Sequence, residues 1–313
     1  MKILTIFAGI FVAFNIGAND AANAMGAAYG ARLLTFKRAS IVVALFALLG
    51  ALHQGERVMK TLGEGILPPP QMSYVMILSL LMGAGVWVGL ATYKGLPVST
   101  THAIMGALVS LGVFENSQVN WILTLRIVLV WILLPLMSGA LVLLFSKFLS
   151  LTLSFVGDIY LFERLLGYLV VGSGCYVAYS LGANNVSNAV GVLVGIDILK
   201  PKMAALLGGV GIGLGALLYG RKVMFTVGRS IALLDPLTAF IAQISAASAL
   251  IVCTFLAIPA SLSQAMVGAI VGVGVLKGTR TIQSGILLRI FSGWVLTPIA
   301  SGVLGVLIFL GLS

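Results

Sequence analysis

One carboxylate stands alone in a long apolar stretch near the start of the chain. Asp20 lies within residues 3–29, which contain no other charged side chain. A charged group at membrane depth costs at least about 2.5–3.5 kcal/mol, so such residues usually serve a function. The asparagines Asn15, Asn19 and Asn23 are spaced to lie on one helical face beside it. Carboxylate and amide oxygens suit a small hard cation, so the pattern predicts a cation site. The alternative is a structural Asp20 that is hydrogen-bonded between helices.

This stretch returns 165 residues later, with one change of chemistry. Residues 14–26 align with residues 179–191, and the glycines near both ends of the two copies coincide. The second copy carries an amide, Asn185, where the first copy carries the carboxylate. The alternative for the asparagines is that they only hold neighbouring helices together through hydrogen bonds. The predicted cation-binding residues are Asn19, Asp20, Asn23, Asn184, Asn185 and Asn188.

A second repeated pattern combines proline with hydroxyl residues. Residues 97–102 read Pro-Val-Ser-Thr-Thr-His, and residues 259–264 read Pro-Ala-Ser-Leu-Ser-Gln. Proline suits the first turn of a helix, and adjacent hydroxyls can cap it. A helix start offers free N–H donors and partial positive charge, which suit an anion. The alternatives are hydroxyls bonded to their own helix and a histidine satisfied in the core. The predicted anion-binding residues are Ser99, Thr100, Thr101, His102, Ser261, Ser263 and Gln264.

The two patterns together predict coupled binding of a cation and an oxyanion. Neither pattern contains lysine or arginine, so donors and dipoles would hold the anion loosely enough for it to leave. A cation bound between Asp20 and the anion would turn their repulsion into coupling. Hydrogen phosphate carries a proton and needs an acceptor as well as donors, whereas sulfate needs only donors. Asp20, His102 and Gln264 offer acceptors, which favours phosphate.

The composition indicates the elements that must position these residues. Of 313 residues, 60% are hydrophobic and 8% are charged, against about 25% charged in soluble proteins. Continuous apolar runs near 20 residues recur along the chain, which predicts an all-α polytopic membrane protein and excludes an alternating β-barrel. Lysines and arginines are scattered through short loops, so the net charge of +10 does not indicate nucleic-acid binding. Cys175 and Cys253 fall in apolar runs and are interpreted as core residues.

The apolar runs divide into two matching halves. Trp131 and Pro135 align with Trp294 and Pro298, in the same order and at nearly the same offset as the other motifs. Residues 1–155 and 156–313 are therefore predicted to be two repeats of about five membrane segments each. An odd number of segments inverts the second repeat, as in secondary transporters. The predicted segments are 3–29, 38–55, 72–93, 97–114, 120–149, 164–194, 202–219, 236–257, 259–276 and 284–312.

Two refinements follow from these segments. The first and sixth are longer than a straight span needs and carry the asparagine motif midway, so they are predicted to be broken helices. If the Pro-Ser stretches are re-entrant hairpins, the number of spans changes. Placing the N-terminus outside puts eleven lysines and arginines in cytoplasmic loops and six outside, a bias that supports this orientation.

The first motif closely resembles a family signature. Residues 17–24, Gly-Ala-Asn-Asp-Ala-Ala-Asn-Ala, are similar to the signature of the Pit-type inorganic phosphate transporters, relatives of solute carrier family 20, and residues 97–102 resemble that family's second block. The resemblance covers both halves. It implies a homodimeric symporter of the cell membrane that couples phosphate to sodium or protons. Sodium would bind at the Asn-Asp motifs and phosphate at the Ser/Thr helix ends. Asn185 departs from the second aspartate of many members, and the second half also resembles the sulfate permease branch.

The expected function is therefore a cation-coupled symporter of inorganic phosphate, with sodium favoured because amide oxygens surround Asp20. The alternatives are a proton-coupled sulfate permease and an anion channel. An enzyme is not expected, because two histidines, two apolar-run cysteines and one buried acid make neither a nucleophile–base pair nor a metal cluster. The expected partners are phosphate, sodium as the only metal, the bilayer and a second copy, with no cofactor and no nucleic acid.

Overall fold

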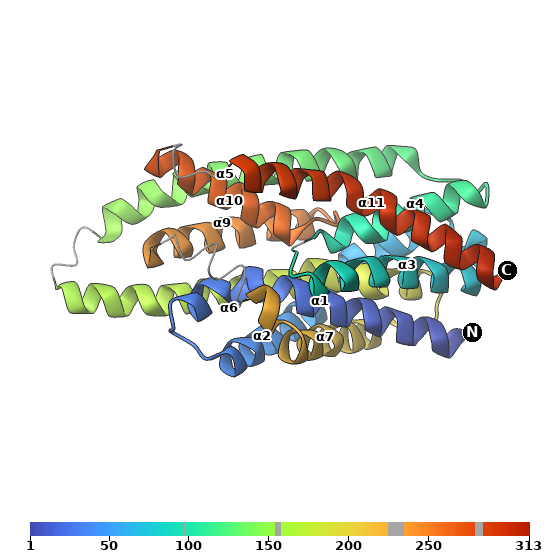
Figure 1. The fold of residues 1–313 in the computed structure, drawn as a ribbon, viewed down its shortest axis with the longest axis horizontal. Coiled ribbons are helices and arrows are strands. Elements are labelled where there is room, and N and C mark those ends of the chain that lie inside the picture. The colour runs from blue at the N-terminus through green and yellow to red at the C-terminus, as the bar shows by residue number, and fades with distance from the viewer. Residues whose placement is uncertain (97, 154–157, 225–234, 279–283) are drawn as a thin grey trace.

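The computed structural model describes residues 1–313 apart from 97, 154–157, 225–234 and 279–283. Within the described residues the regular elements are helices aligned roughly along one axis (Figure 1). Eight are long and apolar enough to cross a membrane, and two apolar helices, α4 and α10, are shorter. The elements are α1 (Lys2–Gly30), α2 (Phe36–Lys60), the π-helix η1 (Thr61–Gly65), the 3₁₀ helix η2 (Pro69–Gln71), α3 (Tyr74–Tyr93), α4 (Thr100–Phe114), α5 (Trp121–Leu153), α6 (Ile159–Gly195), α7 (Pro201–Leu218), α9 (Pro236–Phe255), α10 (Leu262–Lys277) and α11 (Ser284–Leu312).

Each of the ten predicted apolar segments corresponds to one of the α-helices, but two pairs of them form hairpins. Helix α4 folds back along α3, and α10 folds back along α9. The base of the first hairpin is tied by a hydrogen bond from the Gln118 N–H to Gln71 Oε1, 2.8 Å long, and the base of the second by an ion pair between Lys277 and Asp235. Figure 1 shows the hairpins in opposite halves of the molecule, with their turns meeting near its middle. The two hairpins therefore point in opposite directions, which agrees with the predicted inverted repeats and with the re-entrant hairpin alternative.

The prediction that the first and sixth segments are broken helices is wrong. Helices α1 and α6 run without interruption through both asparagine motifs. In a bilayer every backbone polar group needs a partner, and a continuous helix supplies one internally. Gly17 and Gly182 allow neighbouring helices to pack closely and do not break their own helices. A Cβ on Gly17 would overlap the Ile212 carbonyl of α7, and a Cβ on Gly182 would overlap the Ala47 carbonyl of α2. The chain is interrupted in the hairpin turns, beside the motifs.

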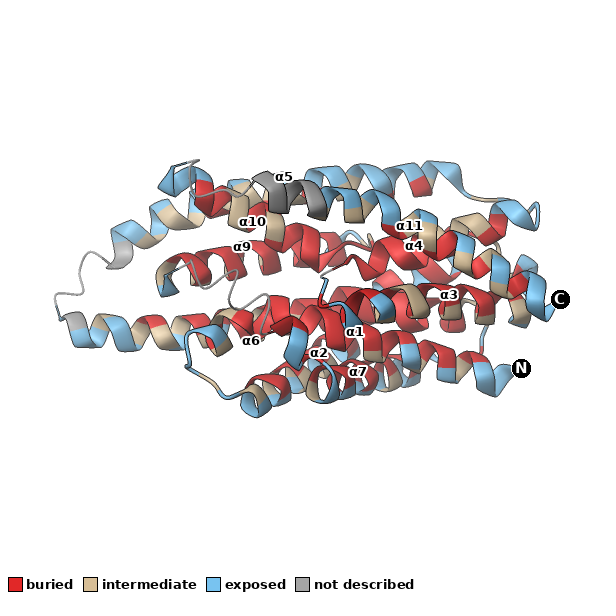
Figure 2. Ribbon diagram, in the orientation of Figure 1, coloured by how far each residue is buried: buried red, intermediate tan, exposed pale blue. Residues whose placement is uncertain are grey.

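Helices α1, α2, α6 and α7 pack into one group, and the two hairpins dock on α1 and α6. Helices α5 and α11 contact the hairpins from the other side. Ser138 on α5 donates a hydrogen bond to the Ala265 carbonyl of α10, and Ser301 on α11 donates one to the Ala103 carbonyl of α4, at 2.6 and 2.8 Å. Figure 2 shows that buried residues gather along the hairpins and α1, whereas α5 is largely exposed. Each outer helix therefore holds the hairpin of one repeat.

The boundary predicted between the repeats, at residues 155 and 156, lies outside the described residues, as does Pro97 of the first hydroxyl motif.

Candidate functional site

The turn of the first hairpin is held by Asn19 of α1. The Asn19 amide donates to Thr92 Oγ1 and to the Leu96 carbonyl, at 2.9 and 3.1 Å, and its oxygen accepts the Val98 N–H at 3.2 Å. Thr92 in turn bonds to the Val88 carbonyl one turn earlier in α3. These bonds satisfy backbone groups that the interruption between α3 and α4 leaves without helical partners.

The second hairpin repeats this arrangement with Asn184 of α6. The Asn184 amide donates to Thr254 Oγ1 at 3.0 Å and to the Ile258 carbonyl at 3.1 Å, and its oxygen accepts the Ala260 N–H at 2.9 Å. Asn19 and Asn184 thus use both polar atoms of their amides to position the hairpin of their own repeat. Thr92 and Thr254 were not predicted from the sequence, although they stand at matching positions and a longer repeat alignment would have paired them.

The remaining motif residues connect one repeat to the hairpin of the other. Asp20, which is 1% exposed, accepts a hydrogen bond from Ser263 of α10 at 3.3 Å. Asn23 lies beside both, 3.3 Å from Asp20 Oδ1 and 3.2 Å from Ser263 Oγ. In the opposite direction, the Asn188 amide donates to Thr101 Oγ1 of α4 at 2.9 Å, and Thr101 donates to the Ala260 carbonyl at 3.0 Å. The two hairpin turns and the two motif helices therefore meet in one buried cluster.

Several buried polar atoms in this region have no hydrogen-bond partner among the described residues. An unpaired buried polar atom costs roughly 1–3 kcal/mol, so such atoms are rare unless a ligand completes them. Thr100 and Asn185 also face the Asp20 carboxylate. The unpartnered atoms in the two repeated motifs are Asp20 Oδ2, Thr100 Oγ1, His102 Nε2, Asn185 Oδ1, Asn188 Oδ1 and Gln264 Oε1.

The helices of both hairpins begin beside this cluster. Ser99 is the N-cap of α4 and accepts the His102 N–H at 3.2 Å, and Ser261 is the N-cap of α10 and accepts the Gln264 N–H at 3.3 Å. Each capping hydroxyl keeps its own proton to donate. The buried N-termini of α4 and α10 add partial positive charge. The cluster thus combines one carboxylate and amide oxygens with hydroxyl donors and two helix starts.

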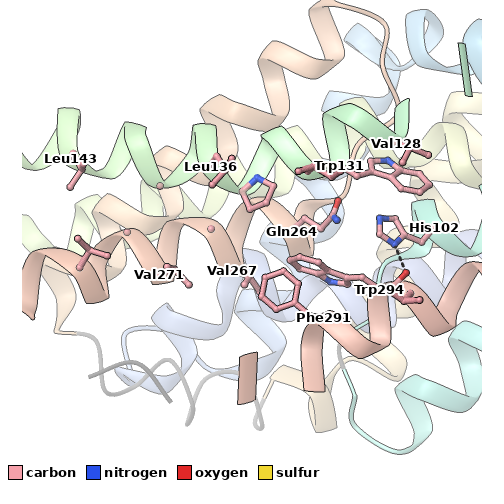
Figure 3. A pocket seen from close by; sticks show the side chains of 17 residues that line it. His102, Val128, Trp131, Leu136, Leu143, Gln264, Val267, Val271, Phe291 and Trp294 are labelled. Carbon is pink, nitrogen blue, oxygen red and sulfur yellow. Dashed lines mark hydrogen bonds between the residues drawn. The ribbon is translucent and has the colours of Figure 1, made fainter. Parts of the chain in front are cut away.

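His102 and Gln264 face a space that Asp20 does not line. Both line a cavity between α5, α10 and α11 (Figure 3). The His102 ring stacks on Trp131, with ring centroids 3.9 Å apart, and its Nδ1 lies 3.0 Å from the Trp294 carbonyl. The structure therefore brings together eleven of the thirteen predicted site residues and sets these two on the other face of the hairpin helices.

Comparisons with known proteins agree on one family. The Phosphate transporter family model matches residues 16–162 and again residues 160–305. A candidate phosphate permease of Pyrococcus furiosus is 31% identical, with 98% of this chain and 95% of that protein covered. The chloroplastic inorganic phosphate transporter 2-1 of Arabidopsis thaliana is 27% identical, with 97% of this chain and 70% of that protein covered.

A solved structure points the same way. The structure described as the sodium-dependent phosphate transporter superimposes with a TM-score of 0.92, at 28% sequence identity, over 99% of this chain and 98% of that one. The resemblance noted in the sequence is confirmed, and with it a multi-pass membrane transporter in place of an enzyme. The chain belongs to the phosphate transporter family.

Proposed function

We propose that this protein is a sodium-coupled symporter of inorganic phosphate that works by alternating access. The observation that carries the proposal is the buried cluster, in which unpartnered acceptor oxygens of Asp20, Asn185 and Asn188 surround the meeting point of two hairpins. Acceptors without donors suit a cation, and a single carboxylate among neutral oxygens balances one positive charge. The sodium dependence named for the structural relative supports the choice of ion.

The proposed cation ligands are Asp20, Asn23, Asn185 and Asn188. Asn19 and Asn184 belong to the same site as the residues that hold the hairpins, and each of their oxygens keeps a second lone pair.

The proposed phosphate ligands are the hydroxyls and free N–H groups at the hairpin helix starts. These are the side chains Ser99, Thr100, Thr101, Ser261 and Ser263, and their hydroxyls donate without adding charge. His102 and Gln264 are not among the proposed phosphate ligands, because their side chains line the cavity between α5, α10 and α11.

Bound sodium would couple the two substrates. A buried carboxylate repels a phosphate anion, and a cation between them converts the repulsion into attraction, so each substrate favours binding of the other. Because the two hairpins come from opposite ends of the molecule, each can close the site to one side of the membrane.

The assignment of sides and partners rests on the charges and on the family. Both termini lie at one end of the molecule (Figure 1), and basic residues concentrate at the other end, which is proposed to be cytoplasmic. The N-terminus is then outside, the bilayer is the cell membrane and the family resemblance supports a homodimer.

The test is uptake of labelled phosphate into proteoliposomes at constant pH, with an inward gradient of sodium or of choline. Sodium-driven uptake that sulfate does not compete with is expected. Ser263→Ala is expected to raise the KM for phosphate about tenfold, since one hydrogen bond to a charged ligand is worth roughly 1.5–3 kcal/mol. Ser245→Ala is the matched control, because Ser245 on α9 is also buried but bonds only to the Ile241 carbonyl in the described structure.

The other outcomes separate the alternatives. Uptake driven by a proton gradient and competed by sulfate would identify a proton-coupled sulfate permease. Anion flux without dependence on any coupling ion would identify a channel.

A further inference from the structure

The cavity lined by His102 and Gln264 does not include Asp20 among its lining residues. It has a volume of about 610 Å³, within the range of sites for small organic ligands. Its walls are almost entirely apolar and come from α5, α10 and α11. Figure 3 shows Trp131 and Trp294 on either side of the Gln264 amide and the His102 ring.

The mouth of this cavity opens among exposed apolar side chains of two candidate membrane-spanning helices. Its rim includes Leu136 and Val295, each 66% exposed, and Phe291, which is 50% exposed. These residues belong to α5 and α11, both of which are long and apolar enough to cross the membrane. If both helices cross the membrane, a molecule that enters between them comes from the bilayer, where exposed apolar side chains are favoured.

The inner end of the cavity is polar and incomplete. His102 and Gln264 are 3% and 2% exposed, and His102 Nε2 and Gln264 Oε1 have no hydrogen-bond partner among the described residues. Both atoms belong to side chains that line the cavity. The cost of leaving them unpaired favours an occupant that supplies the missing bonds.

The hydrogen bond at the other ring nitrogen fixes what that occupant must offer. Pro298 has no N–H, so the Trp294 carbonyl one turn earlier in α11 has no helical donor. The His102 Nδ1 takes that place at 3.0 Å, and because a carbonyl only accepts, Nδ1 carries the proton. In the neutral ring Nε2 is then an acceptor, as is Gln264 Oε1. The Gln264 side chain lies beside the His102 ring, so a donor that enters the cavity there meets both acceptors.

We propose that this cavity binds a hydrophobic phenol or alcohol dissolved in the membrane, whose hydroxyl donates to His102 Nε2 or Gln264 Oε1. The flat walls of Trp131, Trp294 and Phe291 suit a ring. A lipid acyl chain, or the apolar helix of a second copy, would fill the walls but leave both acceptors unpaired. The site is separate from the proposed transport cluster and does not depend on the identity of the transported ion.

Tryptophan fluorescence tests the proposal directly. The full-length protein with Trp87→Phe and Trp121→Phe retains only Trp131 and Trp294, which both line the cavity. In nanodiscs it would be titrated with 4-bromophenol and with 4-bromotoluene, which has a methyl group in place of the hydroxyl. We expect saturable quenching by 4-bromophenol at a membrane concentration roughly 3–10-fold lower than for 4-bromotoluene, the effect of one hydrogen bond.

Two sets of variants show where the quencher binds. Val271→Phe narrows the cavity and should remove the saturable quenching, whereas Val303→Phe, at an exposed position of α11 outside the cavity, should leave it unchanged. In the double variant His102→Phe/Gln264→Leu, the two compounds should quench at equal membrane concentrations.

Four results would overturn the proposal. The first is equal or unsaturable quenching by the two compounds in the parent protein, and the second is quenching that Val271→Phe does not affect. The third is equally strong saturable quenching by a phosphatidylcholine with brominated chains, which would make an acyl chain the occupant. Quenching that disappears as the protein associates would assign the cavity to a second copy and equally exclude the phenol site.

Discussion

The two hairpins are held in the same way but face different chemistry. Asn19 and Asn184 make the same three hydrogen bonds, each to a threonine, a carbonyl and an N–H of its hairpin. One residue further along, the first repeat has the carboxylate of Asp20 and the second has the amide of Asn185. The hydrogen bonds that hold the hairpin are therefore the same in both repeats, whereas the charge of the following residue differs. If the cluster binds a cation as proposed, this difference concentrates the binding energy on the Asp20 side.

The largest expected effect comes from removing that charge. Asp20→Asn makes the two repeats alike, and we expect sodium-driven phosphate uptake to fall about 100-fold, which corresponds to roughly 2.7 kcal/mol for a lost charged ligand. Asn185→Ala should cost less, because it removes one neutral oxygen. Proteoliposome uptake at several sodium concentrations measures both. Equal losses for the two variants would contradict the asymmetry.

Adding a charge to the other repeat tests the same asymmetry in reverse. Asn185→Asp places a second carboxylate beside Asp20 in a buried site, where two negative charges repel each other unless a cation lies between them. We expect the melting temperature of this variant to rise far more steeply with sodium than that of the parent protein. Choline chloride at equal ionic strength is the control. A sodium response unchanged from the parent would show that residue 185 lies outside the cation site.

The shared scaffold predicts equal effects at its two asparagines. Asn19→Ala and Asn184→Ala each leave several hairpin groups unpaired, so each should lower stability by about 2–4 kcal/mol. Thermal unfolding in nanodiscs compares them, with Lys37→Ala, at an exposed position of α2, as the control. If one variant loses much more unfolding free energy than the other, the two hairpins are not held equivalently.

The two hairpin turns carry different residues at one position where the backbone has positive φ. Gly95 and Ala257 stand at matching places and both have positive φ, +74° and +57°. A residue with a Cβ is strained there by roughly 1–2 kcal/mol. Gly95→Ala should therefore lower the melting temperature and Ala257→Gly should raise it slightly. If Ala257→Gly instead destabilises the protein, its methyl group contributes more through packing than its backbone loses through strain.

The smallest expected effect is a pH dependence confined to the base of the second hairpin. Partial burial raises the pKa of Asp235, but Lys277 and the Thr238 N–H outweigh it, so the pKa lies below its ordinary value of 3.8. A lowered pKa in the folded state adds stability above the ordinary value, and this stability disappears as the pH falls through the folded pKa.

Melting curves between pH 3 and 6 test this. Asp235→Asn should weaken the loss of stability at the acid end. Gln71→Ala, at the uncharged base of the first hairpin, should shift the melting temperature equally at every pH. A parallel pH shift for both variants would contradict the assignment.

The sequence alone determined the elements and the residues of interest. Helix positions followed from continuous apolar runs, because a bilayer leaves few other structures open to a chain. The repeat followed from matching prolines, asparagines and tryptophans at a nearly constant offset, and the family model likewise matches the chain twice. Asp20 was identifiable because an isolated carboxylate in an apolar run requires an explanation.

Only the tertiary structure determined which hairpin each of these residues contacts. Spacing along one helix could not show that Asn19 holds its own hairpin while Asn23 contacts the hairpin of the other repeat, since both partners are distant in sequence. It also could not show that His102 faces α11, because the carbonyl that orients it is freed by Pro298, almost 200 residues away in the chain. Local patterns fix helices and their polar residues, and only the packing of the two hairpins against four long helices fixes which polar atoms meet.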